Sequence, residues 1–472
     1  NAFTSRLPSA LAAMGVLWFM LQWTKKEAED QMKSLVSPLT SFVLLTTFLF
    51  FYEARMVQID ILLCFFVTAS MTECYHLISD NRRSLWPLAI YMGFGTLAKG
   101  PIAFLLPLGS SATYIFLNKI AWKNLPWKSL LLSFIVPITW LLFLLVEVIE
   151  TKEWSYFNNL LWKQTVVRYT NSWHHEQPFY YFLISFLYDF FPWTPFFFIA
   201  LFFPLKRWLS KSNQEKFAWS VCLFVLIFFS IPSGKRNIYI LPLFPFAAYL
   251  VALSIHDYLI LSVLPKIYKW IFSILFTLFM IAALFLVIIA TEIFPIHYLK
   301  RIDIQIPYQS IFYFGCSLFV ISFSGFLNIK KKSFKNCIII LILLMVQINL
   351  FTFQIILPTL DPIRSVRGFM QEVIKITETE NKKPILGMVD FREGFRFYGN
   401  QPIVELNDAK GESKNGTFGV EKFWELYPQG WLIINKTHWE TYCKEKSMIG
   451  IIKYEQIISI QKTYYLIRKQ IN

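Results

Sequence analysis

The sequence predicts a polytopic α-helical membrane protein of about twelve spans that ends in an extracytoplasmic α/β domain. Hydrophobic residues make up 56% of the 472 residues, whereas charged residues make up only 16%. Apolar runs of about 17–24 residues, long enough to cross a bilayer as a helix, recur too often for one soluble core. After residue 357, short β-rich runs alternate with helical spacing. These observations predict a transmembrane domain at 1–357 and a soluble domain at 358–472.

The apolar runs define the predicted spans and, through them, the orientation. The spans lie at residues 8–23, 36–52, 60–78, 86–98, 101–117, 129–149, 178–204, 217–231, 238–254, 270–292, 307–327 and 337–357. The connecting segments on one side carry Lys25, Lys26, Lys33, Arg82, Arg83, Lys119, Lys123, Lys128, Lys206, Arg207, Lys211, Lys216, Lys266, Lys269, Lys330, Lys331, Lys332 and Lys335. Those on the other side carry Arg55, Lys99, Lys152, Lys163, Arg168, Lys235, Arg236, Lys300 and Arg301. The positive-inside rule places the first, about twice as basic, in the cytoplasm, so Asn1 and the soluble domain lie outside.

The predicted soluble domain shows no nucleotide-binding motif. Apolar residues recur with helical spacing over 364–379 and again near 420–426 and 438–446. The β-rich runs lie at 385–389, 403–406, 431–434, 449–454 and 464–467. Such alternation predicts an α/β domain. The sequence contains neither GxGxxG nor a P-loop, so nucleotide binding is not supported.

Charge and cysteine content exclude two further classes of protein. A net charge of +15 would suit a nucleic-acid partner, but the positive-inside distribution accounts for it. We therefore expect the lipid bilayer as a partner and no nucleic acid. The six cysteines form no CxxC pair and show no zinc-ligand spacing, so cysteine and zinc chemistry are not predicted.

The turn over 51–60 joins two spans with very little linker and carries three charges. It places Glu53, Arg55 and Asp60 at the outer interface. Because Asp60 directly precedes an apolar run, its charge must be paired or line a wet cavity. Two interpretations stay open: an Arg55–Asp60 pair that holds two helices together, or acidic groups of a membrane-embedded site.

Two other outer turns place cations at span ends. Lys99 lies in a tight turn in which Gly100 permits close backbone approach and Pro101 starts the next helix. Lys235 and Arg236 are adjacent at the start of the next apolar run. Each of these cations alone fits an interface anchor that snorkels towards water. Their coincidence on one side favours a socket for an anionic lipid head group.

The longest outer loop contains a second polar cluster. Residues 154–168 have the aromatic and apolar content of a helix that lies along the interface. After it come Arg168, His174, His175 and Glu176. Adjacent histidines diverge on a strand or helix and make a poor chelate, so a divalent metal is the minor alternative. Hydrogen bonding to substrate or phosphate is the favoured role.

Five motifs in this order resemble the bacterial aminoarabinose-transferase and protein-mannosyltransferase-like family. They are Glu53-Ala-Arg-x-x-x-x-Asp60, Leu97-Ala-Lys-Gly-Pro101, His175-Glu-Gln-Pro-Phe-Tyr-Tyr181 followed by Pro192-Trp193, Lys235-Arg-Asn-Ile-Tyr-Ile-Leu-Pro-Leu-Phe-Pro245, and Gly394-Phe-Arg-Phe-Tyr398. Each motif is weak alone, whereas five in register are fairly specific. The resemblance covers essentially the whole chain.

The resemblance implies a C-type membrane glycosyltransferase of the bacterial inner membrane with a periplasmic C-terminus. It implies a polyprenyl-phosphate-linked sugar as donor, no nucleotide sugar, and one more N-terminal span, giving about 13 in the intact chain. The acceptor is a membrane lipid or glycan, such as lipid A, or a protein hydroxyl. The family's main catalytic acid lies in the loop after that extra span. We therefore expect this sequence to be a fragment that lacks that acid.

The resemblance also assigns roles to the outer residues. An acceptor hydroxyl must be oriented or deprotonated by a carboxylate, and a departing phosphate must be stabilised by cations. The expected catalytic acids are Glu53 and Asp60, with Asp60 orienting Arg55 or the acceptor. The residues expected to bind substrate are Arg55, Lys99, Arg168, His174, His175, Lys235, Arg236 and Tyr239. No cofactor is expected.

Two other classes of function are weighed against this one. A secondary transporter or flippase predicts ionisable residues near span centres, or broken helices in two related halves. Only Glu147 and Asp189 are such candidates, and no two-fold internal symmetry is evident. A membrane scaffold whose soluble domain binds a partner would need a recognition motif there, and none is obvious.

Overall fold

The computed structural model describes most of the chain and divides it into two compact units. The described residues are 2–25, 35–79, 84–160, 176–202, 212–260, 264–291, 306–378, 385–389, 391–399, 402–406, 419–446, 450–458 and 462–469. The first unit comprises 1–282 with 317–349, and the second comprises 283–316 with 350–472. The domain boundary between residues 357 and 358 stays a prediction.

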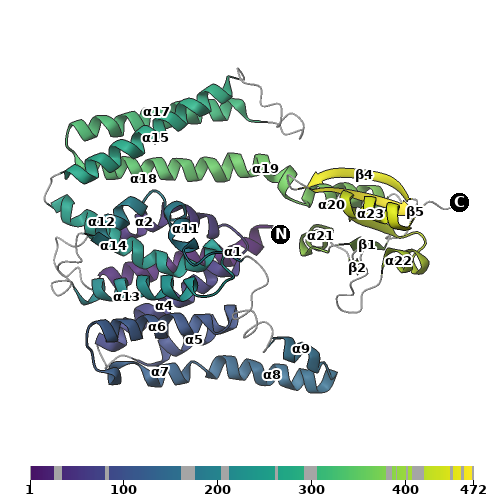
Figure 1. Cartoon of the computed structure of the whole chain (residues 1–472), viewed down its shortest axis with the longest axis horizontal. Helices are drawn as coiled ribbons and strands as arrows, with labels where there is room; N and C mark the ends of the chain where they lie inside the picture. The colour runs from purple at the N-terminus through teal and green to yellow at the C-terminus, as the bar shows by residue number, and fades with distance from the viewer. Residues whose placement is uncertain are drawn as a thin grey trace. The chain divides into compact units, whose positions relative to one another are not determined.

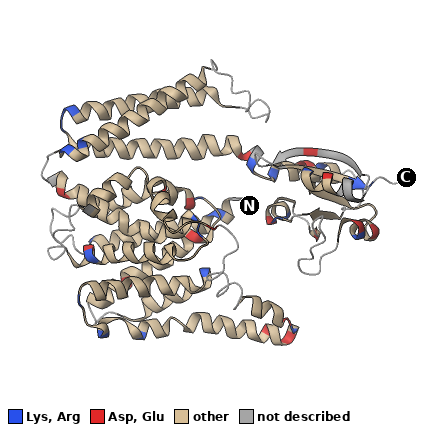
Figure 2. Ribbon diagram, in the orientation of Figure 1, with Lys and Arg blue, Asp and Glu red and all other residues tan. Residues whose placement is uncertain are grey.

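Helices make up the first unit in the part of the chain that the structure describes (Figure 1). The elements up to residue 351 are α1 (Ala2–Lys25), α2 (Val36–Leu45), α3 (Phe48–Glu53), α4 (Ile59–Ser79), α5 (Trp86–Lys99), α6 (Ile102–Leu117), η2 (Trp122–Asn124), α7 (Trp127–Leu132), α8 (Ile135–Thr151), α9 (Trp154–Asn158), α11 (Tyr181–Asp189), α12 (Thr194–Phe202), α13 (Asn213–Ser230), η5 (Asn237–Leu243), α14 (Phe244–Ile260), α15 (Lys266–Ala290), α17 (Tyr308–Lys330) and α18 (Phe334–Phe351). Figure 2 shows Lys and Arg mainly at helix ends and in connections, so most of each helix body lacks them.

Seven helical segments among the described residues are long and apolar enough to span a membrane. They are Phe3–Lys25, Ile59–Ser79, Trp127–Thr151, Asn237–Leu259, Lys266–Ala290, Tyr308–Lys330 and Phe334–Asp361. The predicted class, a polytopic helical membrane protein, is confirmed, whereas the count of twelve spans is not.

Two predicted spans are each broken into two short helices, and the breaks contact each other. The span predicted at 36–52 is broken between α2 and α3, and the span predicted at 178–204 between α11 and α12. The Trp193 indole N–H donates to Thr46 Oγ1 at 2.9 Å, and the Phe48 backbone N–H donates to Phe191 O at 3.3 Å. The two breaks are thus joined by hydrogen bonds between their polar groups. Irregular backbone is tolerated inside a membrane protein where neighbouring segments satisfy such groups.

Helices α4 and α14 form the interior of the first unit. Trp23 of α1 lies against both, with its ring centre 5.6 Å from that of Tyr75, 5.4 Å from Phe246 and 5.0 Å from Tyr249. By contrast, α8 exposes large apolar side chains such as Phe143, which is 74% exposed. An apolar exposed face of this kind suits contact with lipid chains.

The second unit carries a five-stranded mixed sheet in the order β2-β1-β3-β5-β4. Its remaining elements are the π-helical turn Thr352–Ile356, α19 (Leu357–Arg364), α20 (Arg367–Glu378), β1 (Leu386–Val389), α21 (Glu393–Gly399), β2 (Ile403–Leu406), α22 (Val420–Leu426), β3 (Trp431–Asn435), α23 (Lys436–Lys446), β4 (Gly450–Ile458) and β5 (Lys462–Lys469). Strand β1 pairs in parallel with β2 and β3, whereas β5 pairs antiparallel with β3 and β4. The five predicted strands and the predicted α/β domain are confirmed.

Helices cover both faces of this sheet. Phe369 of α20 and Phe395 of α21 are fully buried in one hydrophobic cluster, and Phe423 of α22 and Trp439 of α23 lie in the other. The helix before the sheet contains Pro358 and continues to Arg364, whereas the last predicted span ends at residue 357. The π-helical turn just before Pro358 accommodates the missing backbone donor.

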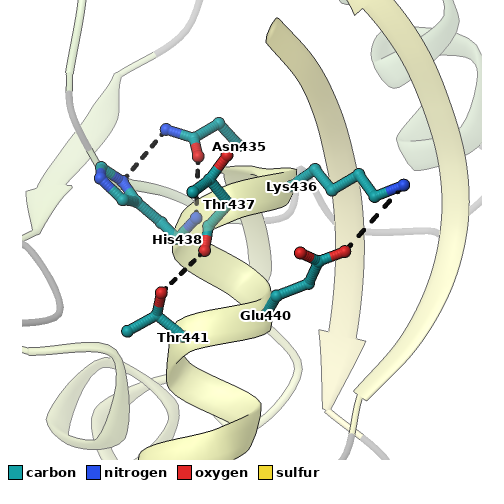
Figure 3. Close-up of polar contacts among 6 residues, drawn as sticks. All are labelled: Asn435, Lys436, Thr437, His438, Glu440 and Thr441. Atoms are coloured by element: carbon teal, nitrogen blue, oxygen red, sulfur yellow. Dashed lines mark hydrogen bonds and ion pairs between the residues drawn. The ribbon is translucent and has the colours of Figure 1, made fainter.

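Strand β3 passes directly into α23 at a side-chain cap (Figure 3). Asn435 Oδ1 accepts a hydrogen bond from the His438 backbone N–H at 2.9 Å, and Asn435 Nδ2 lies 3.1 Å from His438 Nδ1. Lys436, the first residue of α23, and Glu440, one helical turn later, form an ion pair with 4.0 Å between Nζ and Oε1. Asn435 therefore serves as the N-cap of α23, a role in which asparagine is favoured.

Candidate functional site

The first unit brings four of the predicted site residues into one neighbourhood. Glu53 ends α3, Asp60 lies in the first turn of α4, and Lys99 ends α5. Arg236 lies just before η5 and, like Asp60 and Lys99, is close enough to Glu53 to shift its pKa. Residues from four separate elements, spread over more than 180 positions of the chain, thus converge.

Asp60 forms an ion pair with Lys99 across two helices. Lys99 Nζ donates to Asp60 Oδ1, and the same ammonium lies 4.9 Å from the centre of the Tyr239 ring. The pair is only partly exposed, at 25% for the Lys99 side chain and 11% for Asp60. Gly100, with φ of 74°, makes the turn that ends α5 at this point. An acidic group and a cation are therefore held together at the end of α5, with an aromatic face beside the cation.

Arg55 takes a different place from the other charges of its turn. Its side chain is exposed, and its guanidinium carbon lies 5.8 Å from the centre of the Phe51 ring. The ion pair of Asp60 with Lys99 connects α4 to α5.

Glu53 is a buried acid with an unusual proton affinity. It is 1% exposed, and within the described residues its Oε2 has no hydrogen-bond partner. Burial raises the pKa of Glu53 to about 7, and the negative charge of Asp60 adds to the increase. The positive charges of Arg236 and Lys99 offset part of it. Glu53 therefore changes charge near neutral pH, where general acid–base groups are most effective.

The raised pKa of Glu53 predicts a pH-dependent stability. The folded protein keeps the Glu53 proton up to about pH 7, whereas the unfolded chain releases it near 4.5. Folding is therefore favoured most below pH 4.5, and this contribution, about 3 kcal/mol, is lost as the pH rises towards 7. We expect Glu53→Gln to raise the thermal midpoint in detergent at pH 8 but not at pH 4.5. Equal changes at both values would contradict the buried-acid assignment.

The loop over 233–237 is fastened to the end of the long outer loop. Gly234 forms an isolated antiparallel bridge with Glu176, and the Gln177 N–H donates to Ser233 O at 3.0 Å. This short pairing holds the loop in an extended conformation. Side chains of an extended segment point alternately to opposite sides.

Lys235 and Arg236 follow that alternation and differ sharply in environment. Lys235 is 3% exposed, and its ammonium donates to the backbone carbonyls of Gln177 at 3.0 Å and Pro232 at 2.5 Å. Arg236, with φ of −129° and ψ of 142°, has an exposed side chain. Both cations were predicted to bind a phosphate. In the structure, two of the three N–H donors of the Lys235 ammonium are used by backbone carbonyls. Arg236, whose side chain is exposed, is here called the open cation.

Asp189 and Asn237 are additional site residues that the sequence analysis did not place in the site. Asn237 Nδ2 donates to Asp189 Oδ1 at 3.0 Å, and Asp189 is 1% exposed. Asp189 also lies close enough to Glu53 to influence its pKa. The available signal was a charged residue inside an apolar run, three positions before Pro192. Such a charge is costly unless it has a partner.

Three of the predicted site residues lie in a segment that the structure does not describe. Arg168, His174 and His175 fall outside the described residues. Among the residues that the structure does describe, no group of three or more His, Cys, Asp or Glu side chains could hold a metal ion.

Comparisons with known proteins match this chain over its membrane part and its fold. The family model of dolichyl-phosphate-mannose-protein mannosyltransferase matches residues 1–155. A relative from Pectobacterium carotovorum, undecaprenyl phosphate-alpha-4-amino-4-deoxy-L-arabinose arabinosyl transferase, is 27% identical over 261 residues, which is 53% of this chain and 44% of the relative. An uncharacterised protein of Aquifex aeolicus is 24% identical over 404 residues, covering 82% of this chain and 72% of its own length.

The fold comparison extends the likeness to nearly the whole chain. The crystal structure of ArnT from Cupriavidus metallidurans bound to undecaprenyl phosphate superposes with a TM-score of 0.71 at 15% identity, over 98% of this chain and 83% of that one. The chain is thus similar in sequence to aminoarabinose transferases and, over residues 1–155, to protein mannosyltransferases, and it has the fold of the ArnT structure. The aligned part spans less than half the length of the Pectobacterium transferase, whereas the superposition with the ArnT structure covers 98% of the chain.

Proposed function

We propose that the protein transfers a sugar from a polyprenyl-phosphate-linked donor to a hydroxyl or phosphate acceptor in the membrane, of which lipid A is the first candidate. The observation that carries this proposal is the convergence of carboxylates and cations at the ends of membrane helices. Glu53 and Asp60 stand beside Lys99 and Arg236 in one neighbourhood. Relatives named as undecaprenyl-phosphate-aminosugar transferases support it.

The proposed reaction forms one bond and breaks one. The acceptor oxygen attacks the anomeric carbon of the sugar, and the bond from that carbon to the phosphate oxygen breaks, leaving polyprenyl phosphate. Arg236 and Lys99 supply positive charge where negative charge develops on the departing phosphate. Glu53, with a pKa near 7, is placed to take the acceptor proton. Asp60 holds the Lys99 ammonium in position.

The acidic side of the site favours an amino sugar as the transferred group. Glu53 Oε2 is buried, and within the described residues it has no hydrogen-bond partner. Such an oxygen is costly unless a ligand supplies a donor. Asp60 and Asp189 add negative charge around it. The amine of an amino sugar would donate a hydrogen bond to Glu53 Oε2, and the donors named for the relatives carry a 4-amino group.

The proposed location is the outer side of a bacterial inner membrane, with the C-terminal unit in the periplasm. Its support is the distribution of Lys and Arg, which is about twice as dense in the connecting segments on the opposite side. A lipid-linked donor then reaches the site within the membrane, and no nucleotide sugar is required.

A transfer assay tests function, sugar and side together. Membrane vesicles containing the protein would receive undecaprenyl-phosphate-linked 4-amino-4-deoxy-L-arabinose or mannose, with lipid A as acceptor. We expect labelled lipid A from the amino sugar donor, in right-side-out but not in inverted vesicles supplied with external substrates. Vesicles carrying Asp60→Ala would serve as the inactive control. Absence of transfer from both donors would refute the proposed function, and equal transfer from both would refute the preference for an amino sugar.

A further inference from the structure

Asp189 lies at the break between α11 and α12, within the span predicted at 178–204. It is the last residue of α11. The interruption beyond it is secured by the hydrogen bonds from the Trp193 indole to Thr46 and from the Phe48 backbone to Phe191. A buried charge inside a membrane protein is retained where it has a partner or a function.

The partner of Asp189 is the residue next to the open cation. Asp189 Oδ1 accepts from Asn237 Nδ2 at 3.0 Å, and Asn237 directly follows Arg236. Arg236 is extended, so its side chain and that of Asn237 leave the backbone on opposite sides. Fixing the Asn237 side chain against α11 therefore fixes the direction in which Arg236 points. Lys235, on the other side of Arg236, is fixed by two backbone carbonyls.

We propose that Asp189 is a positioning residue, which acts through Asn237 to hold Arg236 towards the phosphate of the lipid-linked donor. This inference rests on the proposed function. The carboxylate has one advantage over a neutral acceptor, because it makes a charge-assisted hydrogen bond, which is stronger and shorter than a neutral one.

The test is a set of variants that separates positioning from general folding. Asp189→Ala removes the acceptor, and Asn237→Asp places two carboxylates face to face. The exchange Asp189→Asn with Asn237→Asp restores a donor and an acceptor in reversed order. Each change is also made in an Arg236→Ala background. Asp257→Asn, at a residue whose side chain is 76% exposed, is the matched control.

The readouts are binding of undecaprenyl phosphate to the full chain in detergent and the KM and kcat of transfer. We expect Asp189→Ala and Asn237→Asp each to weaken undecaprenyl phosphate binding and to raise KM by about 10-fold or more, as losses of orienting partners do. We expect the exchange variant to recover most of both, the Arg236→Ala background to abolish the effect of Asp189→Ala, and the control to match wild type.

Two results would overturn the inference. One is an Asp189→Ala effect that is the same with and without Arg236, which indicates a contribution to folding alone. The other is an exchange variant that is as weak as Asn237→Asp. If Asp189→Ala fails to fold, the exchange pair still decides. Failure of the proposed function is separately visible, because wild-type protein would then bind undecaprenyl phosphate without transferring any sugar.

Discussion

Replacing Arg236 by alanine is expected to lower the turnover number for sugar transfer by about 100- to 1,000-fold, the effect of removing one fixed group that stabilises developing charge. The Arg236 side chain is exposed and lies close enough to Glu53 to lower its pKa, whereas the ammonium of the adjacent Lys235 donates to backbone carbonyls. The measurement is the initial rate of labelled sugar transfer from the lipid-linked donor to lipid A, at saturating donor.

Lys235→Met is the matched control for this prediction. It removes an adjacent positive charge but also leaves the carbonyls of Gln177 and Pro232 without their donor, which costs about 1–3 kcal/mol of stability. We therefore expect a lower thermal midpoint and a turnover number close to wild type for the folded fraction. Arg236→Lys should recover only part of the loss, because lysine keeps the charge without the bidentate fork. The assignment fails if Lys235→Met abolishes turnover while Arg236→Ala leaves it intact.

The membrane class and the outer cluster were readable from the sequence because both depend on local pattern. Apolar runs and the uneven distribution of lysine and arginine require no knowledge of tertiary contacts. The short turns around Asp60 and Lys99 likewise predicted charges at helix ends, and the structure brings these two side chains together. Which acid pairs with which cation depends on helix packing, so the sequence left an Arg55–Asp60 pair as one alternative.

The breaks within the predicted spans and the hydrogen bonds of Lys235 could not be predicted from the sequence, for physical reasons. A run such as 178–204 has the composition of one helix, and its break is stabilised by the hydrogen bond between Trp193 and Thr46, which are 147 positions apart. Lys235 and Arg236 look equivalent in the sequence. The bridge between Gly234 and Glu176 holds the backbone extended, so the two side chains point to opposite sides. Asp189 was noticed as a charge within an apolar run, whereas its partner Asn237 gives no signal by itself.

In the five-stranded sheet of the second unit, the positions of the strands could be predicted but their order could not. Its five strands were predicted at the right places, because most of them are rich in β-branched or aromatic residues. The prediction ended β4 four residues early and left out two residues at each end of β5. The parallel pairing of β1 with β2 and β3 follows from helices placed between those strands. The sheet order β2-β1-β3-β5-β4 depends on contacts distant in sequence, and the pattern of residues did not specify it.

Lys99→Met is expected to lower kcat/KM for transfer by about 10- to 100-fold, mostly through KM, because two effects add at the phosphate site. The variant removes a cation from the position next to the Tyr239 ring. It also leaves the Asp60 carboxylate, whose side chain is 11% exposed, without its partner, so that an unbalanced negative charge repels the donor phosphate. Steady-state kinetics at varied donor concentration measure both parameters.

A double variant separates the two effects. Adding Asp60→Asn to Lys99→Met removes the unbalanced charge, so we expect KM to recover by several-fold. The recovery should remain incomplete, since the missing cation is not replaced. Such non-additivity is the signature of two side chains in direct contact. Lys152→Met, a change at an exposed lysine in the turn after α8, should leave both parameters as in wild type. Equal losses in the single and double variants would show that Asp60 exerts no repulsion on the donor, and Lys99 would then act independently of its ion pair.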